Sequence, residues 1–364
     1  YYLLDMGLPI AAGGASFGGS IGAFAGAISM IIIYFSKRKE IGKELENSIG
    51  EEETVEKIIR DLLIIAIPIT IGAAIVPIMN SIDAFLVFRR LEKVGFSKIE
   101  ANALFGQLTG HAQTLINLPL IFSTALSISL VPTIAMANTK KDYGEIRKAA
   151  SSSMRITLLI GLPAAFGLFI LAEPIIGLLY YKLSPEEIIN TGKILSILSF
   201  GIIFLTLVQS LTAILQGIGR PIVPVANLAI GALVKIILTY SLTGIRSINV
   251  KGAAISTVVA YFIAALLDLR AVKKYTRLKL NITEVFIKPL ISALGMALVA
   301  KFLHLGLRGI IGGKLATIVA IIVAAIVYFI LLLMTGSLNY EDVVLLSGGE
   351  KVANKLNKMG ILKK

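Results

Sequence analysis

Nine long apolar stretches constrain this chain more than any other feature. They run approximately over residues 10–35, 62–87, 105–136, 156–180, 194–217, 221–244, 252–270, 285–303 and 315–335. A helix needs about 20 mostly apolar residues to cross a bilayer. The sequence therefore predicts an all-α polytopic membrane protein with about nine transmembrane helices.

The charge balance agrees with a chain that lies in a membrane. Only 16% of the residues are charged, whereas soluble domains usually carry about 25%. A net charge of +13 would indicate nucleic acid in a soluble protein, but about two thirds of the 35 Lys and Arg residues fall in alternate loops. Such loops are typically cytoplasmic. We predict no nucleic-acid partner, a plasma-membrane location, an outside N-terminus and a cytoplasmic C-terminus.

The spans and their connections divide the chain into five parts. Residues 1–35 hold one span, and the charged segment 36–61 is predicted to be a cytoplasmic linker helix. Residues 62–275 form a six-helix lobe, and 276–335 add two C-terminal helices. Residues 336–364 are predicted to be an amphipathic cytoplasmic tail.

An internal similarity indicates that the first span is the last helix of an earlier lobe. Residues 14–39 and 252–274 both open with Gly-Ala, become bulky and end in a basic cluster. Six spans separate them, so both cross in the same direction, as parallel repeats do. We therefore expect further helices upstream. The alternative is that small residues are simply frequent where membrane helices pack.

Six prolines fall inside predicted spans and favour helices that bend. Each removes a backbone donor, which a membrane protein tolerates where neighbours or water satisfy the freed carbonyl groups. Bent helices are typical of transporters, although proline is also common in membrane helices generally. The six residues are Pro68, Pro77, Pro119, Pro132, Pro163 and Pro174.

Lys235 is the central candidate for function, because a charged group inside a bilayer is costly. It lies in the middle of VANLAIGALVKIILTY. An ammonium at that depth needs an anion, so we predict either an anionic substrate or an ion pair with Asp83 or Glu173. Asn80 precedes Asp83 by one turn and is expected to share its face, which makes the two candidates for an ion pair or a coupling-ion site.

Other polar residues in or beside the spans are candidates to line a water-filled cavity for an anionic substrate. The structural alternatives are that the arginines anchor the spans at the membrane boundary, that the amides form hydrogen bonds between helices and that the histidine is a packing residue. These candidates are Arg89, Arg90, Gln107, His111, Asn117, Gln209 and Asn227.

Enzyme chemistry finds little support in the sequence. The chain has no Cys and only two His, and it contains no phosphate-binding GxxxxGK[ST] loop. The carboxylates within spans, Asp83, Glu173 and Asp268, are isolated from one another, whereas acid–base or metal chemistry needs them clustered. We predict neither an enzyme, nor a metal site, nor a bound cofactor.

Several strings resemble one transporter family. They include AIPITIGAAIVPIMNSIDAFLVFRRL, GLPAAFGLFILAEPIIGLLY, NLAIGALVKIILTY and GGEKVANKLNKMGILKK, and together such matches cover most of residues 57–364. The chain is similar to the polysaccharide-export and stage V sporulation protein B family, which includes lipid II flippase-like proteins. That family belongs to the multidrug/oligosaccharidyl-lipid/polysaccharide exporter superfamily.

The resemblance implies a fold of fourteen helices in two lobes, of which this chain would supply helices six to fourteen, about the C-terminal two thirds. It implies a flippase that works by alternating access. The cargo would be a polyprenyl-diphosphate-linked sugar or a peptidoglycan precursor such as lipid II, with cell-envelope synthesis enzymes as partners and roles in cell-wall formation or sporulation.

The resemblance also implies coupling to Na⁺ or H⁺. In related flippases an acid of helix seven joins polar residues of helices eleven and twelve in a sodium site, roles open here to Asp83 and Asn227. Helix eleven carries Lys235 and no acid, which speaks against that site. Two other functions stay open: a drug/cation antiporter of the same superfamily, which a basic cavity disfavours, and a non-transporting partner of a cell-wall or polysaccharide synthase.

Overall fold

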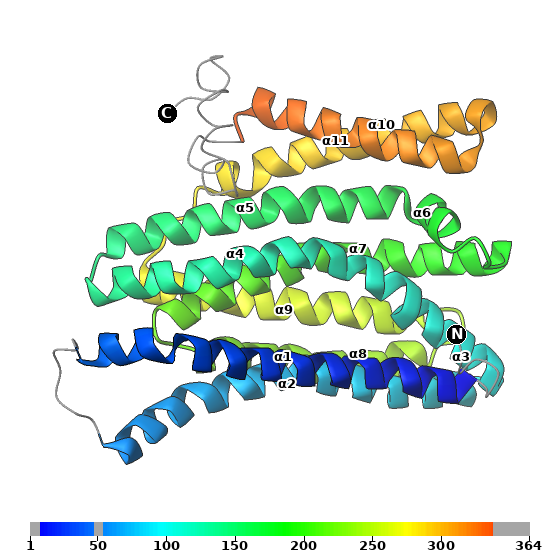
Figure 1. Ribbon diagram of the computed structural model, residues 1–364. Coiled ribbons are helices and arrows are strands. Elements are labelled where there is room, and N and C mark those ends of the chain that lie inside the picture. The colour runs from blue at the N-terminus through cyan, green and yellow to red at the C-terminus, as the bar shows by residue number, and fades with distance from the viewer. Residues whose placement is uncertain (1–7, 47–53, 338–364) are drawn as a thin grey trace. The chain divides into compact units, whose positions relative to one another are not determined.

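The computed structural model describes residues 8–46 and 54–337, and every regular element within them is a helix (Figure 1). Among these residues nine helices are long and apolar enough to cross a membrane, which confirms the number predicted from the sequence. The elements are α1 (Leu8–Glu46), α2 (Val55–Lys93), α3 (Lys98–Gly106), the π-helix η2 (Gln107–Ala112), α4 (Gln113–Thr139), α5 (Tyr143–Ile170), α6 (Ala172–Leu179), α7 (Pro185–Gly217), α8 (Ile222–Thr243), α9 (Lys251–Thr276), the π-helix η3 (Thr283–Ile287), α10 (Lys288–Ile311) and α11 (Gly313–Thr335).

The chain divides into two compact units, residues 1–62 and residues 63–364. In the first unit, α1 runs on past the predicted span as far as Glu46, so it takes in the first part of the charged segment 36–61. The last part of that segment forms the first turns of α2. Residues 47–53 and the tail predicted to be amphipathic lie outside the described residues.

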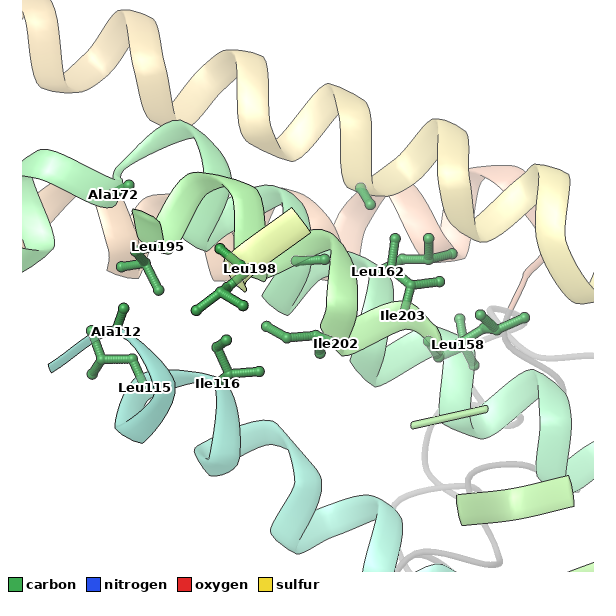
Figure 2. Close-up of a cluster of buried hydrophobic side chains, with 14 of the residues drawn as sticks. Ala112, Leu115, Ile116, Leu158, Leu162, Ala172, Leu195, Leu198, Ile202 and Ile203 are labelled. Carbon is green, nitrogen blue, oxygen red and sulfur yellow. The ribbon is translucent and has the colours of Figure 1, made fainter. Parts of the chain in front are cut away.

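Helix α7 lies at the centre of the second unit, where α4, α5 and α9 pack against it (Figure 1). Figure 2 shows the apolar layer that holds this arrangement: Leu195, Leu198 and Ile202 of α7 lie between two neighbouring helices. On one side are Leu115 and Ile116 of α4, and on the other are Leu158 and Leu162 of α5. All of these side chains are buried.

Hydroxyl side chains join the buried helices to one another. Ser153 of α5 and Ser210 of α7 share a hydrogen bond of 2.7 Å, and Ser123 of α4 donates to the carbonyl oxygen of Thr206 on α7. The Tyr328 hydroxyl of α11 donates to the carbonyl oxygen of Leu159 at 2.8 Å. Lipid tails compete poorly for polar groups, so such bonds stabilise helix association in a membrane.

Two predicted boundaries of the fourth span are wrong. The connection 137–155, between the third and fourth predicted spans, is mostly helix: α4 continues to Thr139 and α5 begins at Tyr143, with the Asp142 side chain capping the first turn of α5. The ends of these helices are rich in polar residues, so hydropathy alone does not identify them as parts of the helices. The stretch 156–180 breaks at Leu171, so Pro174 falls in the first turn of α6. The N–H groups of a first turn make no hydrogen bond within the helix, so a proline there removes none. Pro174 therefore does not bend a helix.

Helices α8 and α9 approach each other closely through small residues. A side chain at Gly231 would place its Cβ 2.7 Å from the carbonyl oxygen of Ala260 on α9. About two turns further along α8, the hydroxyls of Thr239 and Ser256 lie 2.6 Å apart and are fully buried. This close contact determines which face of α8 is buried in the second unit.

We expect Gly231→Ala to destabilise the protein, because the added methyl group has to push against the α9 backbone. Overpacking of this kind costs about 1–3 kcal/mol. Gly306→Ala in α10 is the matched control, since no atom lies within 4 Å of its Cβ position. Thermal unfolding in detergent should show a lower midpoint for Gly231→Ala alone, and equal midpoints for the two variants would contradict the close approach of α8 and α9.

Candidate functional site

The described residues contain a buried ion pair within the spans, between Lys235 of α8 and Asp83 of α2. The Lys235 Nζ atom contacts Asp83 Oδ2, and the two side chains are only 3% and 12% exposed. Of the two partners that the sequence left open for Lys235, Asp83 is therefore the one in contact. Charges attract far more strongly in a low-dielectric interior than in water, so this pair ties α2 to α8.

Asp83 reaches Lys235 because it lies on the buried face of α2. Met79, Asp83, Val87 and Leu91 are all buried and recur every four residues. Asn80 is exposed, so the expectation that it shares the buried face of Asp83 is wrong. The inward stripe follows four-residue steps, which include Met79 and leave Asn80 rotated away from it.

Lys235 belongs to a matching inward stripe on α8. Gly231, Lys235, Thr239 and Thr243 are buried at the same four-residue spacing. Asn227, one step earlier, donates a hydrogen bond of 2.8 Å from Nδ2 to Asp268 Oδ1 on α9. The Asp268 side chain is fully buried, and its Oδ2 atom has no hydrogen-bond partner among the described residues. The sequence does not reveal the link between Asn227 and Asp268, because no spacing rule connects residues on different helices.

A cluster of cations lies at the end of α2, about 10 Å along the helix from Asp83 at 1.5 Å per residue. Arg90 stacks on the Tyr240 ring of α8 at 4.1 Å, and Arg89 stacks on Phe85 at 4.2 Å. The Arg90 Nε atom is buried and has no hydrogen-bond partner in the described part of the chain. A cavity of about 550 Å³, here called the arginine pocket, is lined by Phe85, Leu86, Arg89, Arg90, Glu92, Lys93 and Tyr240.

Gln107 and His111 lie together at a different place, in the π-helix η2 that interrupts the third span. Gln107 is buried, and the His111 ring meets the Tyr180 ring edge to face at 4.3 Å. Gln107 Oε1 and His111 Nδ1 have no hydrogen-bond partners among the described residues. π-Helical turns are frequent at functional sites, and no pattern in the sequence predicted this one.

The remaining two candidates do not join either group. Asn117 is exposed on α4, and Gln209 is partly buried on α7. The sequence-predicted residues thus fall at separate places, and only Asp83, Lys235, Arg89 and Arg90 gather along the contact between α2 and α8.

The structure places a lysine, not a pair of acids, beside Asp83. The Lys235 ammonium supplies the positive charge that a bound Na⁺ would otherwise supply there. Within residues 8–46 and 54–337 no three His, Cys, Asp or Glu side chains come close enough to hold a metal ion. The described geometry places an ion pair at Asp83.

The family model described as lipid II flippase MurJ matches residues 5–324. The chain belongs to this family. The match confirms the resemblance seen in the sequence, and it covers both units of the structure.

Individual relatives agree with the family. The chain is 28% identical over 271 residues to lipid II flippase MurJ of Bacillus subtilis (strain 168), which is 74% of this chain and 49% of the relative. It is 26% identical over 282 residues to stage V sporulation protein B of the same organism, covering 77% of this chain and 53% of the relative. The chain thus spans about half the length of these curated relatives.

A solved structure of lipid II flippase MurJ in an inward closed conformation has the same fold. The TM-score is 0.58 at 20% sequence identity, with 87% of this chain and 61% of that chain covered. At this identity the likeness shows the fold alone. The family match and the nine candidate spans of the described residues support a multi-pass membrane protein of the MurJ family.

We expect Asp83→Leu and Lys235→Met to destabilise the protein singly and much less together. Either single change leaves the other charge buried and alone, which typically costs 3–5 kcal/mol, whereas an apolar pair of similar volume is often neutral. Thermal unfolding of both single variants and the double variant in detergent gives the coupling. If the effects of the two single changes simply add in the double variant, the ion pair does not form in the membrane protein.

Proposed function

We propose that the protein is a flippase that moves a polyprenyl-diphosphate-linked saccharide, such as a lipid II-like peptidoglycan precursor, across the cytoplasmic membrane. Membership of the lipid II flippase MurJ family supports this function. The observation that carries the proposal in the structure is the arginine pocket, where three cations and one carboxylate line a single cavity. A diphosphate headgroup is the chemical complement of such a pocket.

The stacked arginines are suited to bind phosphate oxygens. A guanidinium presents several N–H groups in one plane and can bind an oxyanion through two of them. Stacking on Phe85 and Tyr240 holds the planes of Arg89 and Arg90 in place. Less conformational entropy is then lost when an anion binds, because the side chains are already ordered.

Lys235 acts in this proposal as a positioning residue. Its ammonium already contacts Asp83 and is nearly inaccessible, so it does not face an open cavity in this conformation. The pair instead holds α2 against α8 and thereby sets Arg90 on Tyr240. This role differs from the direct contact with an anionic substrate that the sequence left open for Lys235.

Alternating access remains part of the proposal. A change in the relation of α2 to α8 would alter the arginine pocket, since its lining residues come from both helices. Coupling to Na⁺ or H⁺ is also part of the proposal, and we name no residue as its site. Of the other functions, a drug/cation antiporter is disfavoured, because the cations of the pocket would repel a cationic drug.

We expect the double variant Arg89→Gln/Arg90→Gln to lose cargo transport while it stays folded. Losing two charge-assisted contacts, each worth roughly 1.5–3 kcal/mol, should lower the rate at least about tenfold. The rate is measured as the appearance of the lipid-linked precursor on the outer surface of cells that depend on the full-length protein. Arg308→Gln serves as the matched control, because Arg308 is exposed on α10 outside the pocket.

Two outcomes of this experiment have different meanings. Undiminished transport by the double variant removes the arginine pocket from the mechanism. Failure of the wild-type protein to expose any lipid-linked precursor contradicts the flippase function itself.

A further inference from the structure

A second cavity in the described structure has a character opposite to that of the arginine pocket. It has a volume of about 280 Å³ and lies where α5, α7, α9 and η3 meet. Thirteen of its fourteen lining side chains are apolar, and Lys273 is the exception. This groove, here called the α9 groove, is lined by Met154, Leu158, Phe204, Leu207, Leu211, Phe262, Ala265, Leu266, Leu269, Lys273, Leu280, Ile282, Val285 and Phe286.

The α9 groove opens on the surface of its unit. Phe262 is 45% exposed, Ile282 is 60% exposed and Phe286 is 37% exposed. All three lie on elements that form or adjoin candidate membrane spans. In a bilayer such an opening meets acyl chains rather than water.

The groove has the length of one membrane leaflet. Phe262 and Lys273 lie on α9 eleven residues apart, which corresponds to about 16 Å at 1.5 Å per residue. One leaflet contributes about 15 Å of hydrocarbon, half of a core about 30 Å thick. Lys273 lies in the last turn of α9, where the hydrocarbon of that leaflet would give way to headgroups.

Lys273 is part of a cluster of exposed cations. Among the residues that the structure describes, no carboxylate lies within ion-pair distance of any of them. Four to eight cations immediately next to a membrane helix are typical of sites that attract anionic lipids. The cluster consists of Arg270, Lys273, Lys274, Arg277 and Lys279.

We propose that the α9 groove binds an acyl chain of an anionic phospholipid whose headgroup phosphate lies at Lys273. The apolar lining accepts the chain, the groove length matches one leaflet, and the cations, which pair with no described carboxylate, complement the headgroup. This site is separate from the arginine pocket, and its occupation does not depend on what cargo the protein moves.

A fluorescent reporter can test the site directly, because the chain contains no Trp. The variant Phe286→Trp places the single tryptophan in the groove lining with an aromatic replacement. Phe329→Trp is the matched control reporter, because Phe329 is 46% exposed on α11 and does not line the groove. Each protein is titrated in neutral phosphatidylcholine with phosphatidylglycerol or phosphatidylcholine that carries bromine on its acyl chains, since bromine quenches tryptophan on contact.

We expect brominated phosphatidylglycerol to quench the Phe286→Trp reporter more strongly than brominated phosphatidylcholine does. The Phe329→Trp reporter should show no preference. Adding Lys273→Gln should weaken the preference about fivefold, because one cation at the membrane surface changes anionic-lipid affinity by roughly that factor. Adding Lys274→Gln should preserve most of the preference, since Lys274 is a neighbouring cation that does not line the groove.

Three results would overturn the proposal. Equal quenching by the two lipids would mean that ordinary boundary lipid covers the groove. A preference that survives Lys273→Gln would place the headgroup elsewhere. Displacement of the brominated lipid by a polyprenyl phosphate but not by unlabelled phosphatidylglycerol would identify the occupant as a polyprenyl lipid of the cargo type. Phe262→Trp offers a second reporter in the same groove if Phe286→Trp does not fold.

Discussion

The contact between Lys235 and Asp83 is the interaction on which the proposed site depends. A charged group in the bilayer interior is stable only when it is paired or solvated, and here each residue satisfies the other. The pair fixes the inward faces of α2 and α8 together. Those two faces in turn bring Arg90 against Tyr240 and form one side of the arginine pocket.

The positive charges near this contact have two different roles, one in the ion pair and the other in the arginine pocket. Lys235 is paired with Asp83 and buried, whereas Arg89, Arg90 and Lys93 line a cavity. A transporter of an anionic headgroup needs cations that the headgroup can reach and release. A lysine that is already bound to a carboxylate meets that need poorly, whereas stacked arginines at a cavity meet it well.

Much of the fold could be predicted from the sequence because hydrophobic length alone determines which segments cross a bilayer. The ion pair of Lys235 was foreseeable in part. A buried ammonium needs an anion, and the sequence left Asp83 and Glu173 open as its partners. Finer geometry was not foreseeable. The π-helix at Gln107 and the bond from Asn227 to Asp268 depend on tertiary packing, which no local pattern encodes.

The most direct test of this account is cargo transport by the double variant Asp83→Leu/Lys235→Met of the full-length protein, compared with each single variant. If Lys235 only positions α2 through Asp83, the apolar double variant should transport nearly as well as the wild type, while both single variants fail. If the double variant folds stably but transports nothing, Asp83 or Lys235 acts directly in transport, and a purely positioning role for the pair is wrong.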